Sequence, residues 1–126
     1  MDWTIAIVIA VILTAFFVLK RLAFVSAETA REYLAKGALV IDVRSTGEFS
    51  SGHVTGAVNI PLDDLRESLP RRVQDRNQVL LLHCLSGGRS AIAKQQLKRM
   101  GYRNVFNLGS INRARKIVVA GQAGAN

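Results

Sequence analysis

The segment 84–90, with the sequence CLSGGRS, combines a nucleophile with the residue types of an anion-binding loop. It follows an apolar run at 79–83 that indicates a buried strand, and it precedes a helix expected over 90–100. Ligands of parallel α/β sheets bind just beyond the carboxyl ends of the strands. Gly87 and Gly88 allow the loop to curl with its N–H groups inward, and such a cradle at a helix N-terminus binds anions.

Cys84 is expected to be a thiolate, because the cradle and the helix N-terminus lower a thiol pKa by a few units from about 8.5. Arg89 adds a positive charge with two-pronged geometry for sulfate-like or phosphate-like groups. The competing interpretation is a buried structural cysteine beside a chance Gly-Gly turn. The coincidence of position, glycines and arginine favours chemistry. The residues expected to bind the substrate are Leu85, Ser86, Gly87, Gly88 and Arg89.

Alternating strands and helices must position this loop. Apolar and β-branched runs predict strands at 23–25, 38–43, 58–60, 79–83 and 105–108. Helices are expected at 26–36, 62–73, 90–100 and 111–120. Ser26 is the expected N-cap of the first of these helices, and Gly37 ends it. The alternation predicts an α/β domain in which a parallel sheet is flanked by helices on both faces.

Residues 3–19 carry no charge and predict one transmembrane helix ahead of this domain. A cleaved signal peptide is the first alternative, since residues 25–27 resemble a cleavage site, but the basic start of a signal is missing. A buried core helix is the second, and a helix apolar on every face does not suit so small a domain. Asp2 before the span, with Lys20 and Arg21 after it, predicts a cytoplasmic domain by the positive-inside rule.

From about Phe24 to Gly109 the sequence resembles the rhodanese family. The pieces that carry the resemblance occur in the family's order and spacing: Ile41-Asp42-Val43-Arg44, Glu48-Phe49, the run GHVTGAVNIP at 52–61, the cysteine loop, Gly101-Tyr102 and Leu108-Gly109. The resemblance implies a rhodanese-like parallel sheet and a sulfurtransferase. Its loop cysteine would take a sulfane sulfur from a donor such as thiosulfate, and the persulfide would pass it to a thiol, cyanide or protein acceptor.

Loop length separates sulfur chemistry from phosphorus chemistry within this resemblance. Cys84 to Arg89 spans six residues, as in sulfurtransferases, whereas related phosphatases and arsenate reductases have one residue more.

The alternative function is a catalytically idle, membrane-attached rhodanese binding module. The intact Cys84 and Arg89 argue against this alternative, because idle modules commonly lose the cysteine.

Other polar residues of the family pattern are expected to support the site. Asp42 either orients the loop or has a turn or cap role. Arg44 with Glu48, and His53, are expected to make structural pairings of the family pattern. Catalysis by His53 is the less favoured alternative, because the reaction needs no histidine base once the thiolate exists. His83 is expected to pack away from the loop.

The sequence therefore predicts an anchor at 1–22, a rhodanese-like domain at 23–120 and a flexible tail at 121–126. No cofactor and no metal are expected. Residues 66–116 contain twelve Lys or Arg and two acids. Three roles are open for this basic surface: it faces anionic lipid, it attracts anionic donors, or it is merely solvated. A nucleic-acid partner is not expected, since no binding motif is present. Many family members carry a tryptophan where this chain has Ala114 or Arg115.

Overall fold

The computed structural model describes residues 2–124, including the side chains of residues 2–20 and 23–121. Within that range one parallel sheet has the strand order β2-β1-β3-β4. Its strands are β1 (Leu39–Asp42), β2 (Val58–Asn59), β3 (Leu80–His83) and β4 (Val105–Gly109). This arrangement confirms the expected α/β fold, and it gathers the carboxyl ends of β1 and β3 at one edge of the sheet.

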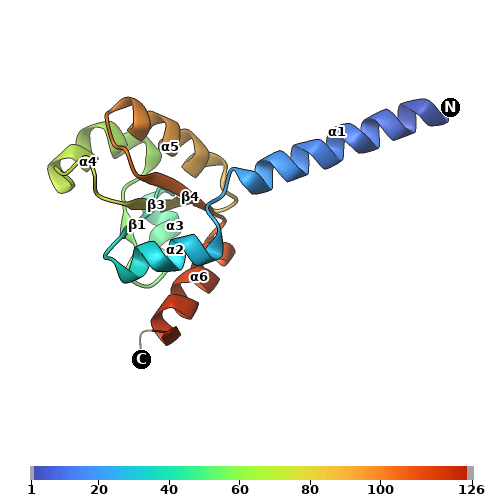
Figure 1. Ribbon diagram of the computed structural model, residues 1–126. Helices are drawn as coiled ribbons and strands as arrows, with labels where there is room; N and C mark the ends of the chain where they lie inside the picture. Colours follow the sequence, from blue (N-terminus) through green and yellow to red (C-terminus); the bar gives the residue numbers. More distant parts are fainter. Residues whose placement is uncertain (1, 125–126) are drawn as a thin grey trace.

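Helices cover both faces of the sheet (Figure 1). On one face lie α4 (Leu65–Arg72) and α5 (Gly88–Arg99), and on the other lie α2 (Ala27–Ala35) and α6 (Ile111–Gly124). Side chains of a strand point alternately to the two faces, so Leu80 and Leu82 pack among α4 and α5 while Leu81 packs among α2 and α6. All three leucines are fully buried, which explains why the β3 sequence is apolar throughout.

The ends of α2 follow the expected local chemistry. Ser26 caps the helix, because its Oγ accepts a hydrogen bond from the Thr29 N–H at 3.2 Å. Gly37, just beyond the end, has a φ of 93°, a left-handed conformation that glycine adopts without a steric penalty. These two residues therefore set the helix bounds as the sequence predicts.

The expected strand at 23–25 is wrong. Val25 donates one backbone hydrogen bond to the Asn107 oxygen of β4 at 2.9 Å, but its own carbonyl accepts from the Arg113 side chain. The Arg113 side chain thus occupies the Val25 carbonyl, which would have to accept the next backbone hydrogen bond of a β-ladder. The segment runs beside β4 without joining the sheet.

Three helices differ in extent from the prediction. The segment expected at 62–73 is divided into a 3₁₀ turn, η1 (Leu62–Asp64), and α4. α5 begins at Gly88, directly after the turn at Gly87. α6 continues past Ala120 to Gly124, where the half-buried Gly121 lies beside Leu34 of α2, so part of the expected tail is helical. Residues 125 and 126 of that tail lie outside the described residues.

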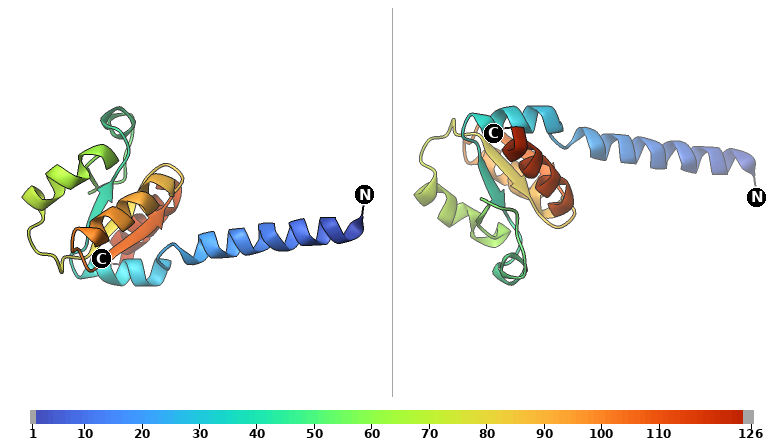
Figure 2. Two further views of the ribbon diagram at one scale, coloured as in Figure 1. Left: turned by 90° about the horizontal axis from the view of Figure 1, so that it is seen from above. Right: turned by 90° about the horizontal axis from the view of Figure 1, so that it is seen from below.

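The N-terminal helix α1 (Trp3–Leu22) projects away from the domain in all three views (Figures 1 and 2). Its window Trp3–Lys20 is long and apolar enough to cross a membrane, and none of that window is buried against the domain. An uncleaved anchor and a signal sequence near the N-terminus share these properties, whereas a soluble core helix would be mostly buried.

We predict that Tyr102→Phe destabilises the domain by about 1–2 kcal/mol. The Tyr102 ring is buried, and its hydroxyl donates to the Val73 carbonyl at 2.6 Å and accepts from Arg76. Loss of the hydroxyl removes the shorter of the two hydrogen bonds to that carbonyl, which then keeps only the 3.5 Å contact from Arg76, and it leaves Arg76 without the hydroxyl as acceptor. Urea denaturation of the purified full chain measures the change. Tyr33→Phe is the control, because this ring contributes by stacking on Phe106, and we expect a change within about 0.5 kcal/mol.

Candidate active site

Cys84 lies directly beyond the carboxyl end of β3, in the middle of the sheet. Its backbone N–H donates to the Gly109 oxygen of the neighbouring strand at 3.3 Å. The residue is 1% exposed, and Leu85, the next residue, is 56% exposed. The sulfur is therefore held at the base of a loop whose outer rim reaches solvent.

The loop curls back over the sulfur at Gly87. Gly87 has a φ of 102°, and its N–H donates to Cys84 Sγ at 3.0 Å. A Cβ on Gly87 would lie 2.8 Å from Cζ of Phe24, closer than real Cβ contacts. Both the left-handed backbone and the close ring therefore require glycine at this position.

A second donor to the sulfur comes from Ser90 in the first turn of α5. Ser90 Oγ lies 3.5 Å from Cys84 Sγ and 2.7 Å from Asn107 Oδ1. A hydroxyl has one proton, so it serves one of these acceptors at a time. Asn107 Oδ1 also accepts from the Gly109 N–H at 2.9 Å, and Asn107 Nδ2 donates to the Gly87 oxygen at 3.2 Å. The buried Asn107 thus ties the curl of the loop to β4 and positions Ser90 below the sulfur.

The pKa of Cys84 is lowered from its ordinary value. Burial by itself raises it, but hydrogen bonds from the Ser90 hydroxyl and from the backbone N–H groups of Ser90, Gly87 and Ser86 together outweigh burial. The N-terminus of α5 adds a partial positive charge on the same side. These donors favour the thiolate over the thiol at Cys84.

Arg89 does not project freely from the loop. Its Nη1 donates to Glu48 Oε1 at 2.6 Å and its Nη2 donates to Glu48 Oε2 at 3.0 Å. Glu48 belongs to the short helix α3 (Thr46–Ser50), where it also accepts from the N–H of the N-cap residue Ser45 at 3.3 Å. The ion pair therefore joins the loop after β3 to the segment after β1. Side chains of Arg89 and Glu48 are 37% and 33% exposed, so solvent species can reach the pair.

The expected pairing of Arg44 with Glu48 is wrong. Arg44 instead binds Asp42, with Nη2 donating to Oδ2 at 2.8 Å and the Arg44 N–H donating to Oδ1 at 2.9 Å. Asp42 is fully buried, and a buried carboxylate requires a close cation and several donors. Arg44 also donates to the Gly52 oxygen at 2.8 Å. Asp42 therefore stabilises the segment after β1 and makes no hydrogen bond to the cysteine loop.

Two histidines lie near these segments without lining the sulfur. His83 is fully buried; its Nδ1 lies 3.2 Å from the Cys84 carbonyl and therefore carries the proton. Its Nε2 faces Asp42 Oδ2 at 3.8 Å, and burial lowers the pKa of His83, which keeps the ring neutral at pH 7. His53 is exposed and stacks on Phe49 with ring centroids 3.8 Å apart, so its contacts are structural.

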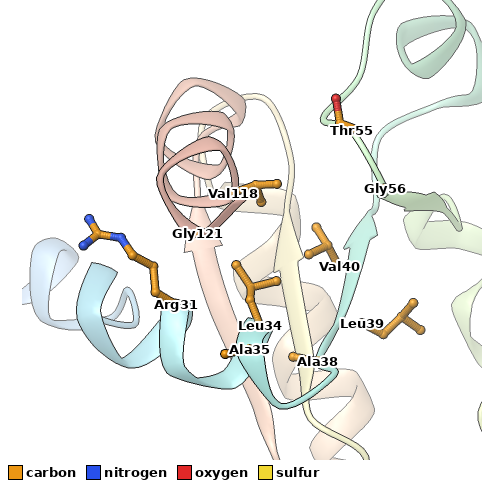
Figure 3. Close-up of a pocket in the computed structure, with 10 residues that line it drawn as sticks. All are labelled: Arg31, Leu34, Ala35, Ala38, Leu39, Val40, Thr55, Gly56, Val118 and Gly121. Atoms are coloured by element: carbon orange, nitrogen blue, oxygen red, sulfur yellow. The ribbon is translucent and has the colours of Figure 1, made fainter. Parts of the chain in front are cut away.

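A cavity of about 370 Å³ lies elsewhere in the domain (Figure 3). It is lined by α2, α6 and the first half of β1, with Leu34, Val118 and Val40 among its side chains, and Thr55 lies at its edge. None of its lining residues belongs to the cysteine loop. This cavity is therefore separate from the candidate site, which is the loop around Cys84.

Sequence reasoning missed two residues that shape this site, Asn107 and Phe24, and it gave Glu48 the wrong partner. The capping role of Glu48 could have been found from the spacing Ser45-x-x-Glu48, which is a capping-box signature. Asn107 stands out as a polar residue inside an otherwise apolar strand. No sequence pattern marks Phe24 as a site residue, because its contact with Gly87 joins segments that are distant in the sequence.

We predict that Ser90→Ala raises the pKa of the Cys84 thiol, since it removes a hydrogen bond that favours the thiolate. The thiolate fraction at pH 7 then falls. Ultraviolet thiolate absorbance as a function of pH measures the shift. Ser86→Ala is the matched control, because Ser86 acts on the sulfur through its backbone N–H, which the substitution retains. Equal pKa values for the Ser90→Ala variant and the unaltered chain would contradict the assignment.

Comparison with known proteins agrees with this geometry. The profile of the Rhodanese-like domain family matches residues 26–122. Thiosulfate sulfurtransferase PspE of Escherichia coli K12 is 39% identical over 71 residues, covering 56% of this chain and 68% of that protein. The human single-domain sulfurtransferase TSTD1 has 30% identity and a TM-score of 0.65, with 75% of this chain and 96% of that chain covered.

More distant matches belong to longer proteins. The tRNA uridine(34) hydroxylase of Erwinia tasmaniensis is 33% identical over 85 residues, which are 63% of this chain and 24% of that protein. The chain thus spans about a quarter of the length of the hydroxylases that it matches. The profile match and the PspE match nevertheless cover most of the domain, and the chain belongs to the rhodanese-like domain family.

Proposed function

We propose that the chain is a sulfurtransferase in which Cys84 carries the sulfur. The thiolate of Cys84 attacks the outer sulfur of thiosulfate, the S–S bond of the donor breaks, and sulfite leaves with the electron pair. The enzyme then holds a persulfide anion, so the charge before and after the step is equal. A thiol, cyanide or a protein acceptor takes the outer sulfur and regenerates the thiolate.

The observation that carries this proposal is the set of donors around the sulfur. The Gly87 N–H lies 3.0 Å from Sγ, and the backbone N–H groups of Ser86 and Ser90 also stabilise negative charge there. After transfer, the loop from Leu85 to Arg89 would surround the outer sulfur and stabilise its charge as an oxyanion hole does. The name of the relative PspE, a thiosulfate sulfurtransferase, supports a donor of the thiosulfate type.

The loop residues have distinct roles in this proposal. Ser86, Gly87 and Gly88 supply backbone N–H groups, and Leu85 forms an exposed rim beside the cysteine. Arg89 attracts the anionic donor by its charge. Asp42 supports the site indirectly, because it holds Arg44 and thereby the segment that carries Glu48.

We predict that Cys84→Ser abolishes sulfur transfer from thiosulfate to cyanide, because the chain has no other cysteine. Intact-mass analysis after thiosulfate treatment should find one added sulfur on the unaltered chain and none on the variant. Thiocyanate formation is measured in parallel. Full activity of the Cys84→Ser variant would rule out the persulfide mechanism.

We further propose that α1 anchors the domain to a membrane and that the domain is cytoplasmic. The support is the uncharged run of the helix, with Asp2 before it and Lys20 after it. α1 ends at Leu22, and α2 begins at Ala27, so the domain is tethered close to the membrane surface. Basic residues of the domain would then lie near anionic headgroups.

The topology is tested by Asn126→Cys in a Cys84→Ser background. A membrane-impermeant thiol reagent should leave this cysteine unlabelled in intact cells and label it after lysis. Labelling in intact cells would place the domain outside. Recovery of a mature chain that begins near Glu28 would identify α1 as part of a signal peptide instead.

A further inference from the structure

The Arg89 guanidinium, which would attract the donor, is already engaged end-on by Glu48. One N–H on each of Nη1 and Nη2 is used, at 2.6 and 3.0 Å, which leaves the Nε–H and the outer N–H groups for a second anion. A donor that binds these groups must lie beside the Glu48 carboxylate. Its attraction to Arg89 is therefore opposed by repulsion from Glu48.

Glu48 is fixed in this position by its own helix. Its Oε1 accepts from the Ser45 N–H at 3.3 Å and from the Ser45 hydroxyl at 3.1 Å, as part of the capping box of α3. The hydrogen bond from Arg89 is the main reason that the pKa of Glu48 falls to about 2. The carboxylate is thus charged at neutral pH. It is not displaced by protonation.

We propose that Glu48 is a specificity-determining residue that favours singly charged sulfane-sulfur donors over the thiosulfate dianion. This inference rests on the proposed sulfurtransferase function and refines its donor class. The attraction to Arg89 and the repulsion from Glu48 are both proportional to the charge of the donor, so Glu48 lowers the binding of the dianion by twice the free energy by which it lowers that of a monoanion at the same place. The backbone donors around Cys84 are not opposed in this way, and they serve both kinds of donor.

A thiosulfonate is a singly charged donor that undergoes the same transfer. The Cys84 thiolate attacks its terminal sulfur, the bond between the two sulfurs breaks, and a sulfinate anion leaves with the electron pair. The enzyme persulfide is identical to the one formed from thiosulfate. The two reactions therefore differ in the charge of the donor and leaving group, and methanethiosulfonate is a suitable probe.

The test compares kcat/KM for thiosulfate and for methanethiosulfonate in the full chain and in Glu48→Gln. Glutamine keeps an oxygen acceptor for Ser45 and removes the charge. A unit charge about 6 Å away in a water-like medium changes binding about threefold, and a double charge about ninefold. We therefore expect the ratio of the two kcat/KM values, thiosulfate over thiosulfonate, to rise about threefold. The change should shrink at molar salt, where the Debye length is about 3 Å.

Ser45→Ala is the matched control, because it removes the cap side chain and leaves both charges of the ion pair in place. Its ratio should equal that of the unaltered chain. A ratio that is unchanged or lower in Glu48→Gln would overturn the inference while transfer from both donors still supports the sulfurtransferase. Failure of the unaltered chain to transfer sulfur from either donor would overturn both.

Discussion

A buried sulfur can carry negative charge only when hydrogen-bond donors reach it, and the structure around Cys84 is organised by that constraint. The N–H of Gly87 reaches the sulfur because that residue adopts a left-handed φ of 102°. Asn107 in β4 holds the carbonyl of Gly87, and the same amide positions the hydroxyl of Ser90. The sheet, the loop and the first turn of α5 are thus joined through one polar group that is itself buried.

The segment that follows α1 contributes to the same loop. Phe24, two residues beyond the last residue of that helix, lies against Gly87 and Gly109. Arg113 lies over the Phe24 ring at 5.6 Å and donates to the Val25 carbonyl, so α6 holds the segment from the other side. The cysteine loop is therefore at the end of the domain from which α1 emerges (Figure 1).

Two ion pairs lie beyond the carboxyl ends of the strands, one within the segment after β1 and one between that segment and the loop after β3, and they differ in exposure. Asp42 and Arg44 are buried, and their mutual hydrogen bonds fix the chain after β1. The side chains of Arg89 and Glu48 are about one-third exposed, so an anion in solution can approach the guanidinium beside the carboxylate. The buried pair consequently supports the fold, whereas the exposed pair sets the electrostatic field that an incoming anion meets.

The sequence by itself determined the α/β class, most of the strands and helices, and the place of Cys84 at a strand end, because these depend on local periodicity, caps and glycines. It did not determine the partners of the charged side chains. Arg44 was expected to bind Glu48, but Asp42 binds Arg44 and Arg89 binds Glu48. It also placed a strand at 23–25, where Arg113 takes the carbonyl that a ladder needs. The contacts of Arg89 with Glu48 and of Arg113 with Val25 join residues far apart in the chain, and only the packed sheet brings them together. Asp42 and Arg44 are neighbours in sequence, but burial after β1 decides that they pair.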